Sequence, residues 1–255
     1  MLAHIVRELR LAGISEALFI VSDRKPQIAS YFGDLCDERL PDQYNLPPLR
    51  CSYVTQTTQR GLGDAILISE DWVGKESFVV AFGDCIIDSP TDSSHPLRRM
   101  ISTHLEKAAL ATVLVEKVAL EKVSRYGILT PLNDQADELA ICFPAKDIVE
   151  KPTPETAPSR LAVAARWILN PDIFDALRHG SLDSKGELNL TDVIKPLLTA
   201  GGILWGVPLL PGEARRDIGN FETFFAAFIR HAFEDSEYGE TTRKLAAELL
   251  ELYKK

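Results

Sequence analysis

The stretch FVVAFGDCII, residues 78–87, decides the fold class. Its first five residues, Phe78 to Phe82, are all apolar, as in a strand that is buried on both faces of a sheet. Asp84 follows after one glycine, so we expect it at the carboxyl edge of the sheet, where open α/β folds bind ligands. Mg²⁺ prefers few carboxylates together with phosphate oxygens, which makes Asp84 a candidate metal ligand. The alternative is that Asp84 only caps a loop.

On both sides of this strand, the sequence alternates between strand and helix patterns. Apolar residues at helical spacing predict a first helix that ends at Gly13, and the ALFIV run that follows predicts a second buried strand. Further helices are predicted near residues 25–32, 63–72, 94–107, 171–178 and 190–199, and further strands near 50–55, 110–116 and 161–169 and at ILWGVPL. Such alternation is typical of an α/β sheet with helices on both faces.

The middle of the chain has a different pattern. The stretches RYGILTP, LAICF and DIVEKP are short extended runs, broken by Asn, Asp and Pro. They predict a small antiparallel extension added to the main sheet.

Composition narrows the class of partner. The chain has 255 residues, 45% of them hydrophobic, and a net charge of −9, with 28 basic residues scattered along it. A nucleic-acid surface needs clustered Lys and Arg, so we expect no nucleic-acid partner and favour a small molecule. An anionic ligand would need a locally arranged site or a divalent metal, because the overall field is repulsive.

Several features predict a cytoplasmic protein. The opening helix carries charges within its apolar pattern, unlike a signal peptide, and no run approaches the roughly 18–20 apolar residues of a membrane span. The four cysteines show neither metal-ligand spacing nor dense pairing, so we expect free thiols.

The stretch TQTTQRGLGDA, residues 55–65, precedes a predicted helix. Gly61 and Gly63 would let the backbone pass close to a flat ligand at the start of that helix. The alternative is a tight strand-to-helix turn.

Two further motifs offer charged side chains. In IVEKP, Lys151 could provide a point charge for a phosphate and Glu150 could accept from sugar hydroxyls, although strand neighbours face the same ligand only if the backbone bends before Pro152. In RRDIGN, Asp217 could supply a second metal-side carboxylate and Gly219 a point of close approach. The alternatives are solvated side chains for the first pair and a helix cap or ion pair for Asp217.

Nucleophilic catalysis has no support in the sequence. The five histidines form no metal-ligand spacing, and no G-x-S-x-G motif is present.

Taken in order, these segments resemble the bacterial UTP:glucose-1-phosphate uridylyltransferases from about residue 2 to about residue 235. The matching stretches are LRLAGISEALFIVS, TQTTQRGLGDAI, FVVAFGDCII, SRYGILTP, IVEKPTPETAPSRLAVAARWIL, GELNLTDVIKPLL and DIGNFETFFAAFIRH. The resemblance implies a Rossmann-like nucleotide-diphospho-sugar transferase fold, in which a mixed, mostly parallel sheet has helices on both faces, with a nucleotidyltransferase domain at residues 1–235. It also implies a C-terminal helix at residues 236–255 as a possible contact in a homo-oligomer.

The resemblance also implies a reaction and its residues. The partners would be UTP, glucose 1-phosphate and the product UDP-glucose, with pyrophosphate released and Mg²⁺ as the cofactor. Each site residue would have one of four roles: Gln56 and Gly61 against the uracil ring, Gly127 and Glu150 at the glucose hydroxyls, Lys151 on the sugar phosphate, and Asp84 and Asp217 at the metal.

The chain departs from the family pattern in two places. The family opens with a strand and a Gly-x-Gly-Thr-Arg loop, whereas Met1 aligns inside the helix that comes afterwards, so we expect the first strand to be absent and its neighbours to lack backbone partners. Asp64 stands where the family usually has His. Two other functions stay open: a non-catalytic sugar-nucleotide-binding protein, and a thymidylyl or cytidylyl transferase acting on a sugar 1-phosphate.

Overall fold

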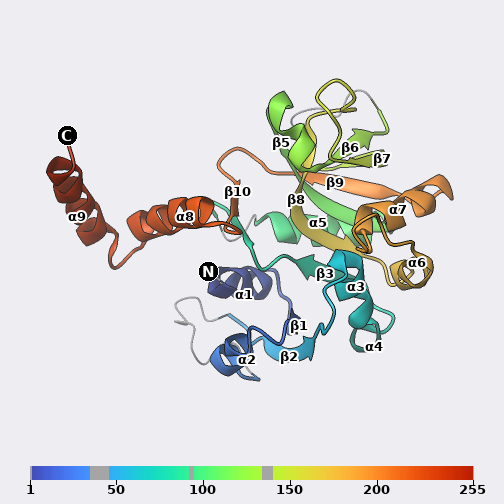
Figure 1. Cartoon of the computed structure of the whole chain (residues 1–255), viewed down its shortest axis with the longest axis horizontal. Helices are drawn as coiled ribbons and strands as arrows, with labels where there is room; N and C mark the ends of the chain where they lie inside the picture. The colour runs from blue at the N-terminus through green and yellow to red at the C-terminus, as the bar shows by residue number, and fades with distance from the viewer. Residues whose placement is uncertain (1, 35–45, 92–94, 134–139, 255) are drawn as a thin grey trace.

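The structure is a computed structural model that describes residues 2–34, 46–91, 95–133 and 140–254. A body of strands and helices holds most of the chain, and two C-terminal helices project from it as an arm (Figure 1). The helices are α1 (Leu2–Leu11), α2 (Gln27–Phe32), α3 (Gly61–Ile68), α4 (Glu70–Val73), α5 (Pro96–Glu106), α6 (Ile173–His179), α7 (Leu190–Thr199), α8 (Phe221–Glu234) and α9 (Gly239–Leu252), with a 3-10 turn at Leu120–Arg125.

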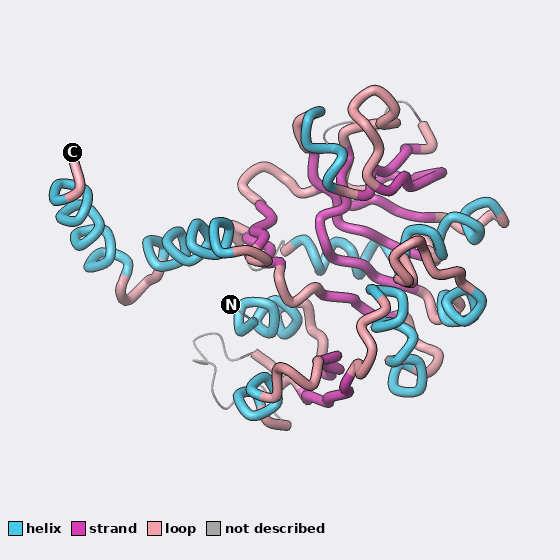
Figure 2. Tube along the Cα trace, in the orientation of Figure 1, coloured by secondary structure: helices cyan, strands magenta, loops and turns pink. Residues whose placement is uncertain are grey.

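The described strands form three sheets. The largest has six strands, in the spatial order β3 (Phe78–Ala81), β8 (Leu161–Leu169), β5 (Ala111–Lys117), β9 (Leu204–Pro208), β7 (Phe143–Glu150) and β6 (Gly127–Pro131). A parallel pair joins β1 (Glu16–Val21) to β2 (Arg50–Thr55), and an antiparallel pair joins β4 (Cys85–Asp88) to β10 (Ala214–Asp217). Figure 2 shows these strands enclosed by helices.

The α/β architecture with mixed sheets is confirmed. The pairs β1–β2 and β5–β9 are parallel, and the extension β6–β7 is antiparallel as predicted. Antiparallel pairing is more extensive than the alternation predicts, because β8 lies between β3 and β5 and runs against both. The extended run predicted at residues 139–143 is strand only from Phe143, and its first residue lies outside the described residues.

Helices cover both faces of the large sheet. Alternate residues of β5 point to opposite sides: Val113 and Val115 pack with residues of α6 and α7, whereas Leu114 packs with residues of α1 and α5. All three are fully buried. A central strand with apolar residues on both faces therefore sits between two helical layers, as its sequence predicts.

The strands β1 and β3 are less buried than their apolar sequences predict. Five of the six β1 residues and all four β3 residues are only half-buried. Among the described residues, β1 pairs only with β2, and β3 pairs only with β8. Each strand therefore has one edge without a strand partner among the described residues.

A buried ion pair ties α1 to the sheet. Arg166 of β8 donates to both carboxylate oxygens of Glu8 at 2.9 and 2.7 Å, and to the carbonyl oxygen of Cys85 at 3.0 Å. The two side chains are 0% and 3% exposed. Charges this deeply buried are tolerated only when they are paired and hydrogen-bonded, so the pair fixes how α1 sits on the sheet.

The arm consists of α8 and α9, which both extend away from the body (Figure 1). One side of α8 carries Phe221, Phe225, Phe228 and Ile229, each more than half exposed. The division predicted at residues 235 and 236 falls between the two helices and stays a prediction.

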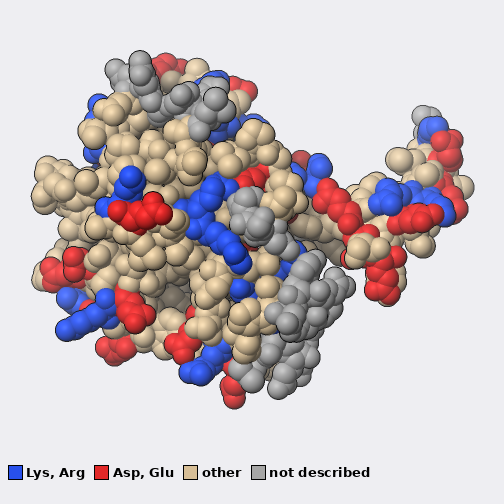
Figure 3. Space-filling model, turned by 180° about the vertical axis from the view of Figure 1, so that it is seen from behind, with Lys and Arg blue, Asp and Glu red and all other residues tan. Residues whose placement is uncertain are grey.

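Charged side chains are spread over the face opposite to that of Figure 1. Seen from behind, one short basic strip lies near the middle of the face, and elsewhere acidic and basic side chains are interspersed (Figure 3). In the described part of the chain, no helix combines the length and apolar character needed to cross a membrane.

Cys85 and Cys142 are free, as expected, but Cys51 is disulfide-bonded, which corrects the prediction for that residue. Spacing along a sequence does not say which thiols meet in space.

Candidate active site

Asp84 and Asp217 are brought together by the pairing of β4 with β10. In this antiparallel register Asp217 lies opposite Cys85, the residue after Asp84. The main-chain N–H of Ile218 donates to the carbonyl oxygen of Asp84 at 2.7 Å, and the N–H of Gly219 donates to the carboxylate of Asp217 at 2.8 Å. Asp84 and Asp217 are far apart in the sequence, but the pairing of their strands places them side by side.

Gly219 separates the two carboxylates. A Cβ atom at this position would lie 3.2 Å from Oδ1 of Asp217 and 3.3 Å from Oδ2 of Asp84, so with any other residue these oxygens would have to shift by a few tenths of an ångström. Both aspartates are exposed and can reach a ligand. The described residues hold no group of three or more His, Cys, Asp or Glu arranged around one metal. Two facing carboxylates nevertheless fit Mg²⁺, which usually takes one or two carboxylates plus phosphate oxygens and waters.

Glu150 and Lys151 face one pocket because the backbone bends between strand and proline. Lys151 has a φ of 45°, in the left-handed region, and its N–H donates to the carbonyl oxygen of Tyr126 at 3.0 Å. Its Nζ lies 3.3 Å from Oε1 of Glu150. The bend that the IVEKP motif requires is therefore present, at a backbone cost that a non-glycine residue bears only where its surroundings enforce it.

Gly127 has no side chain that would crowd the carboxylate of Glu150. The two residues are direct partners in the β6–β7 pairing, and a Cβ atom on Gly127 would lie 3.2 Å from Oε2 of Glu150. The same oxygen accepts a hydrogen bond from the hydroxyl of Thr191 at 3.3 Å. Glu150 is thus held between a strand partner and the first turn of α7.

These side chains line a single pocket of about 280 Å³. It brings together five of the seven residues predicted for the site: Asp84, Gly127, Glu150, Lys151 and Asp217. Gln56 and Gly61 are not among its lining residues. Its walls thus combine carboxylates with a lysine, so it can bind a metal and a phosphate together.

Sequence reasoning missed several residues of this pocket. Arg125 and Arg215 add positive charge, and Arg215 is held by Glu116 at 2.6 Å and by the Tyr126 ring at 4.8 Å. Asn189 and Thr191 bring the amino end of α7 to the pocket, where the helix dipole favours an anion. The helix itself was predicted, but no sequence signal shows that its start faces this pocket.

Gln56 lies at the end of β2, beside α3. Its side-chain amide donates to Oδ2 of Asp64 at 2.8 Å. Because a carboxylate only accepts, this bond fixes the orientation of the amide, and its carbonyl oxygen is left as a possible acceptor. Asp64 also pairs with Arg60 at 3.3 Å. The one departure noted within the glycine motif is therefore the residue that orients Gln56.

Gly61 and Gly63 have a structural explanation. Gly61 has a φ of 87°, and a Cβ atom there would lie 3.0 Å from both the Glu187 side chain and the Leu188 carbonyl oxygen. At Gly63 the corresponding distance to the Leu188 side chain is 2.7 Å. These contacts match the tight-turn alternative, and a contact between Gly61 and a base stays a prediction.

Cys85 also lines the pocket, but it is a poor nucleophile. Burial raises the pKa of its thiol to about 11, with the nearby Asp84 and Glu8 adding to the shift and Arg166 and Arg215 opposing it. At neutral pH the group is therefore a protonated thiol, which does not attack phosphorus.

Carboxylates and cations that meet at the carboxyl edge of an α/β sheet are typical of enzymes that bind nucleotides and act on their phosphates. The family model described as nucleotidyl transferase matches residues 1–232. The chain belongs to this nucleotidyl transferase family.

Within this family, the chain is similar to curated UTP–glucose-1-phosphate uridylyltransferases. The chain is 31% identical over 260 residues to a UTP–glucose-1-phosphate uridylyltransferase of Streptococcus pyogenes, covering 96% of this chain and 82% of that protein. A protein of the same name from Streptococcus pneumoniae is 33% identical over 208 residues, covering 76% of this chain and 67% of its own length.

Solved structures of UDP-glucose pyrophosphorylases are similar to this chain in fold. A UDP-glucose pyrophosphorylase complexed with UDP-glucose superposes with a TM-score of 0.78 at 29% identity, covering 91% of this chain and 86% of that one. A UTP-bound enzyme from Acinetobacter baumannii gives a TM-score of 0.83 at 24% identity, covering 97% and 87%, and supports the fold.

Proposed function

We propose that the protein transfers a uridylyl group from UTP to glucose 1-phosphate, giving UDP-glucose and pyrophosphate. The observation that carries this proposal is the joining of Asp84, Asp217, Glu150 and Lys151 around one pocket. Similarity to a UTP–glucose-1-phosphate uridylyltransferase over 96% of this chain and 82% of that protein supports the choice of substrates.

In the proposed reaction, a phosphate oxygen of glucose 1-phosphate attacks the α-phosphorus of UTP. A new P–O bond forms, the bond between the α-phosphorus and the bridging oxygen breaks, and pyrophosphate leaves with the electron pair. Chemistry of this kind depends mainly on alignment and charge neutralisation. Lys151 would hold the sugar phosphate, and Glu150, steadied by Thr191, would accept from the sugar hydroxyls.

Mg²⁺ is the cofactor in this proposal, held by Asp84 and Asp217. When bound, it supplies charge neutralisation at the phosphates. Gly219 leaves room for both carboxylates, and Arg125 and Arg215 add positive charge to the wall of the same pocket.

Gln56 and Gly61 are proposed to lie against the uracil ring. The amide of Gln56 is already engaged by Asp64, so its carbonyl oxygen is the acceptor that the N–H of uracil requires. Thymine offers the same N–H group. A thymidylyl transfer is therefore the alternative that this contact alone does not separate.

The test is pyrophosphate release by the purified protein from UTP and glucose 1-phosphate with Mg²⁺. Lys151→Ala should lower kcat/KM by about 100-fold, since a charged contact to phosphate is lost. The matched control is Lys146→Ala, because Lys146 is exposed on β7, the strand that Lys151 follows, and does not line the pocket.

Three other outcomes have defined meanings. Binding of UDP-glucose without any turnover would replace the proposal with the non-catalytic binding protein. Equal or faster turnover of dTTP or CTP in competition with UTP would indicate a thymidylyl or cytidylyl transferase. Equal losses in Lys151→Ala and Lys146→Ala would remove Lys151 from the site.

A homo-oligomer is part of the same proposal. The exposed side chains Phe221, Phe225, Phe228 and Ile229 lie on an arm that projects from the body, and a second copy of the chain would cover them. Light scattering should report a multimer, and Phe225→Ser with Phe228→Ser should release monomers that keep their melting temperature. A monomer at micromolar concentration before substitution would contradict this.

We also propose a cytoplasmic location. The proposed reactants, UTP and glucose 1-phosphate, are charged phosphate esters that do not cross a lipid bilayer unaided. Fractionation of the source cells would test it, and recovery of the protein outside the cytoplasm would contradict it.

A further inference from the structure

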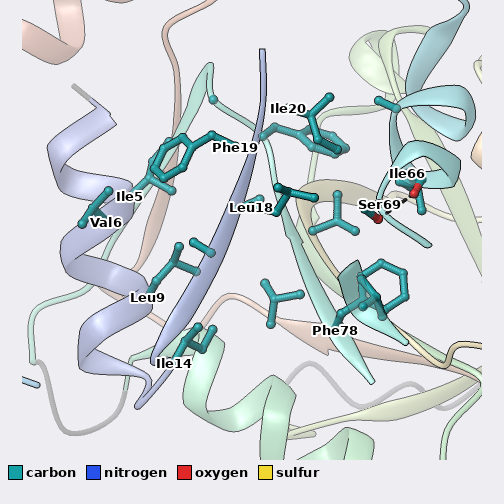
Figure 4. Close-up of a pocket in the computed structure, with 18 of the residues that line it drawn as sticks. Ile5, Val6, Leu9, Ile14, Leu18, Phe19, Ile20, Ile66, Ser69 and Phe78 are labelled. Carbon is teal, nitrogen blue, oxygen red and sulfur yellow. Dashed lines mark hydrogen bonds between the residues drawn. The ribbon is translucent and has the colours of Figure 1, made fainter. Parts of the chain in front are cut away.

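Charged residues make up a larger share of the walls of the active-site pocket than of the larger cavity between β1 and β3. That cavity has many apolar side chains in its walls, among them Ile5, Leu9 and Leu18 (Figure 4). In the active-site pocket, carboxylates, a lysine and two arginines surround about 280 Å³. Charges that are partly buried need partners, so the contacts between these side chains determine where a metal and a sugar phosphate would meet.

Arg215 of this pocket has partners on two other parts of the fold. Its Nε lies 2.6 Å from Oε1 of Glu116 on β5, and its Cζ lies 4.8 Å from the centre of the Tyr126 ring. A guanidinium within about 6 Å of the centre of an aromatic ring is attracted to it. The side chain of Arg215 is only 12% exposed, so both contacts are largely shielded from water. They join β10 to β5 and to the residue that precedes β6.

Tyr126 in turn anchors the turn at Lys151. Its carbonyl oxygen accepts from the N–H of Lys151 at 3.0 Å, and its own N–H donates to the carbonyl oxygen of Val123 at 3.1 Å. Lys151 has a left-handed backbone, which a residue with a side chain keeps only where its surroundings enforce it. The hydrogen bond to Tyr126 is one such constraint, so a displacement of Tyr126 would loosen the turn.

Arg215 also shares one face of β10 with Asp217. Side chains two residues apart on a strand point to the same side. Both residues line the pocket, whereas Arg216 between them does not line it and pairs with Asp88 at 2.7 Å. Asp217 is placed by the backbone pairing of β10 with β4, in which the side chain of Arg215 has no part. Arg215 therefore connects the strand of the metal-side carboxylate to the turn that carries Lys151.

We propose that Arg215 is a positioning residue, which acts through Tyr126 to hold Lys151 at a set distance from Asp217. The inference rests on the proposed transfer reaction, in which Lys151 holds the sugar phosphate and Asp217 the metal. Attack on the α-phosphorus needs both reactants in line, so a movable Lys151 turn would lower the rate even when each reactant still binds. Arg215 itself needs no contact with a substrate in this arrangement.

The first variant is Arg215→Lys, which keeps the positive charge but not the flat group that contacts both Glu116 and the Tyr126 ring. We expect kcat to fall at least about tenfold and the KM for glucose 1-phosphate to rise, while the KM for UTP stays unchanged. Arg216→Lys is the matched control, because Arg216 forms the same kind of ion pair on the same strand but does not line the pocket. It should leave all three values unchanged.

Two further variants test the link through the aromatic ring. Tyr126→Leu removes the ring that Arg215 contacts and should produce the same split between the two KM values. Tyr126→Phe keeps the ring and should behave like the unsubstituted protein.

Hydrogen exchange tests the same turn without substrates. In Arg215→Lys and in Tyr126→Leu, the amide of Lys151 should exchange about tenfold faster, because its acceptor is less firmly held. The amide of Leu132, which donates to the carbonyl oxygen of Pro144 at the other end of the β6–β7 pair, should not change. An unsubstituted protein that releases no pyrophosphate would refute the transfer reaction, whereas the Lys151 amide would still decide whether Arg215 holds the turn.

Three results would overturn the proposal. The first is an unchanged Lys151 amide in Arg215→Lys despite a loss of turnover, which means that Arg215 contacts a phosphate itself. The second is faster exchange of the Leu132 amide as well, or an equal effect in Arg216→Lys, which indicates a general loosening of the fold. The third is a loss in Tyr126→Phe as large as in Tyr126→Leu, which assigns the effect to the hydroxyl group.

Discussion

Asp84 and Asp217 are brought together by the pairing of β4 with β10 and lie on either side of Gly219, so each carboxylate can be tested by a single substitution. Asp217→Asn keeps the shape but removes the charge. We expect kcat/KM to fall by about 100-fold or more, since a lost metal ligand costs several kcal/mol of transition-state stabilisation. Mn²⁺ binding, followed by electron paramagnetic resonance, should weaken in parallel.

The control for this substitution is Asp172→Asn. Asp172 is exposed, lies outside the pocket and makes no side-chain cap hydrogen bond. Unchanged Mn²⁺ affinity in Asp217→Asn would show that the carboxylate has no part in metal binding.

Asp64 is a positioning residue in the proposed base contact. Asp64→Ala removes the shorter of the two hydrogen bonds of the Gln56 amide, and the loss of one such hydrogen bond corresponds to about a tenfold rise in KM for UTP. The value of kcat should change little, and the KM for glucose 1-phosphate should not change. Asp64→Asn retains an oxygen acceptor and should restore most of the affinity, whereas a purely structural role would lower kcat and both affinities together.

At the scale of elements, the ion pair between α1 and β8 is the contact whose loss should be most costly. Glu8→Ala leaves Arg166 charged, buried and without its partner, so we expect a loss of about 3–5 kcal/mol in the free energy of unfolding. Urea denaturation followed by circular dichroism measures it.

Glu16→Ala is the matched comparison for Glu8→Ala. Glu16 pairs with Arg50 at the surface, where the two side chains are 53% and 71% exposed. Exposed pairs contribute at most about 1 kcal/mol, so a similar loss in both variants would show that burial is not the cause.

Element boundaries were predictable where an apolar run ends at a clear signal. The strand at 161–169 and the helix at 190–199 lie where the sequence places them. The direction of β8 was not predictable, because an apolar run indicates burial but not which strands lie beside it. The low burial of β1 and β3 was not predictable for the same reason, because the burial of a strand depends on which elements lie beside it as well as on its own residues.

The candidate site was predictable in part for a related reason. Asp84, Glu150, Lys151 and Asp217 stand next to strand ends in recognisable motifs, and the structure brings them together. Arg125, Arg215 and the start of α7 carry no such signal. They reach the pocket only through tertiary packing, which no local pattern encodes.

For the whole molecule, stability should depend on pH through buried histidines. Burial, with smaller contributions from His231 and Arg7, lowers the pKa of His4 from 6.5 to about 4, and Asp88 opposes this shift. Burial also lowers the pKa values of His95 and His104. Below pH 6.5 the unfolded chain binds protons that the folded chain does not, so stability is complete above that pH and is lost as pH falls towards 4.

Between pH 7 and pH 5 we expect a loss on the order of 1–2 kcal/mol, discounted for the partial exposure of His4, or roughly 2–8 °C in melting temperature. Differential scanning calorimetry at constant ionic strength measures it. His4→Gln should flatten the dependence, and His179→Gln, at an exposed histidine, should leave it unchanged. A melting temperature that rises on acidification would contradict the assignment.

The arm begins directly after the candidate active site in the sequence. Asp217 ends β10, Asn220 caps α8 through a hydrogen bond to the N–H of Thr223 at 3.0 Å, and only Ile218 and Gly219 lie between them. The arm is therefore connected to Asp217 through Ile218 and Gly219 alone. We therefore expect a contact that displaces α8 to shift Asp217 relative to Asp84, which would link assembly to the proposed metal site.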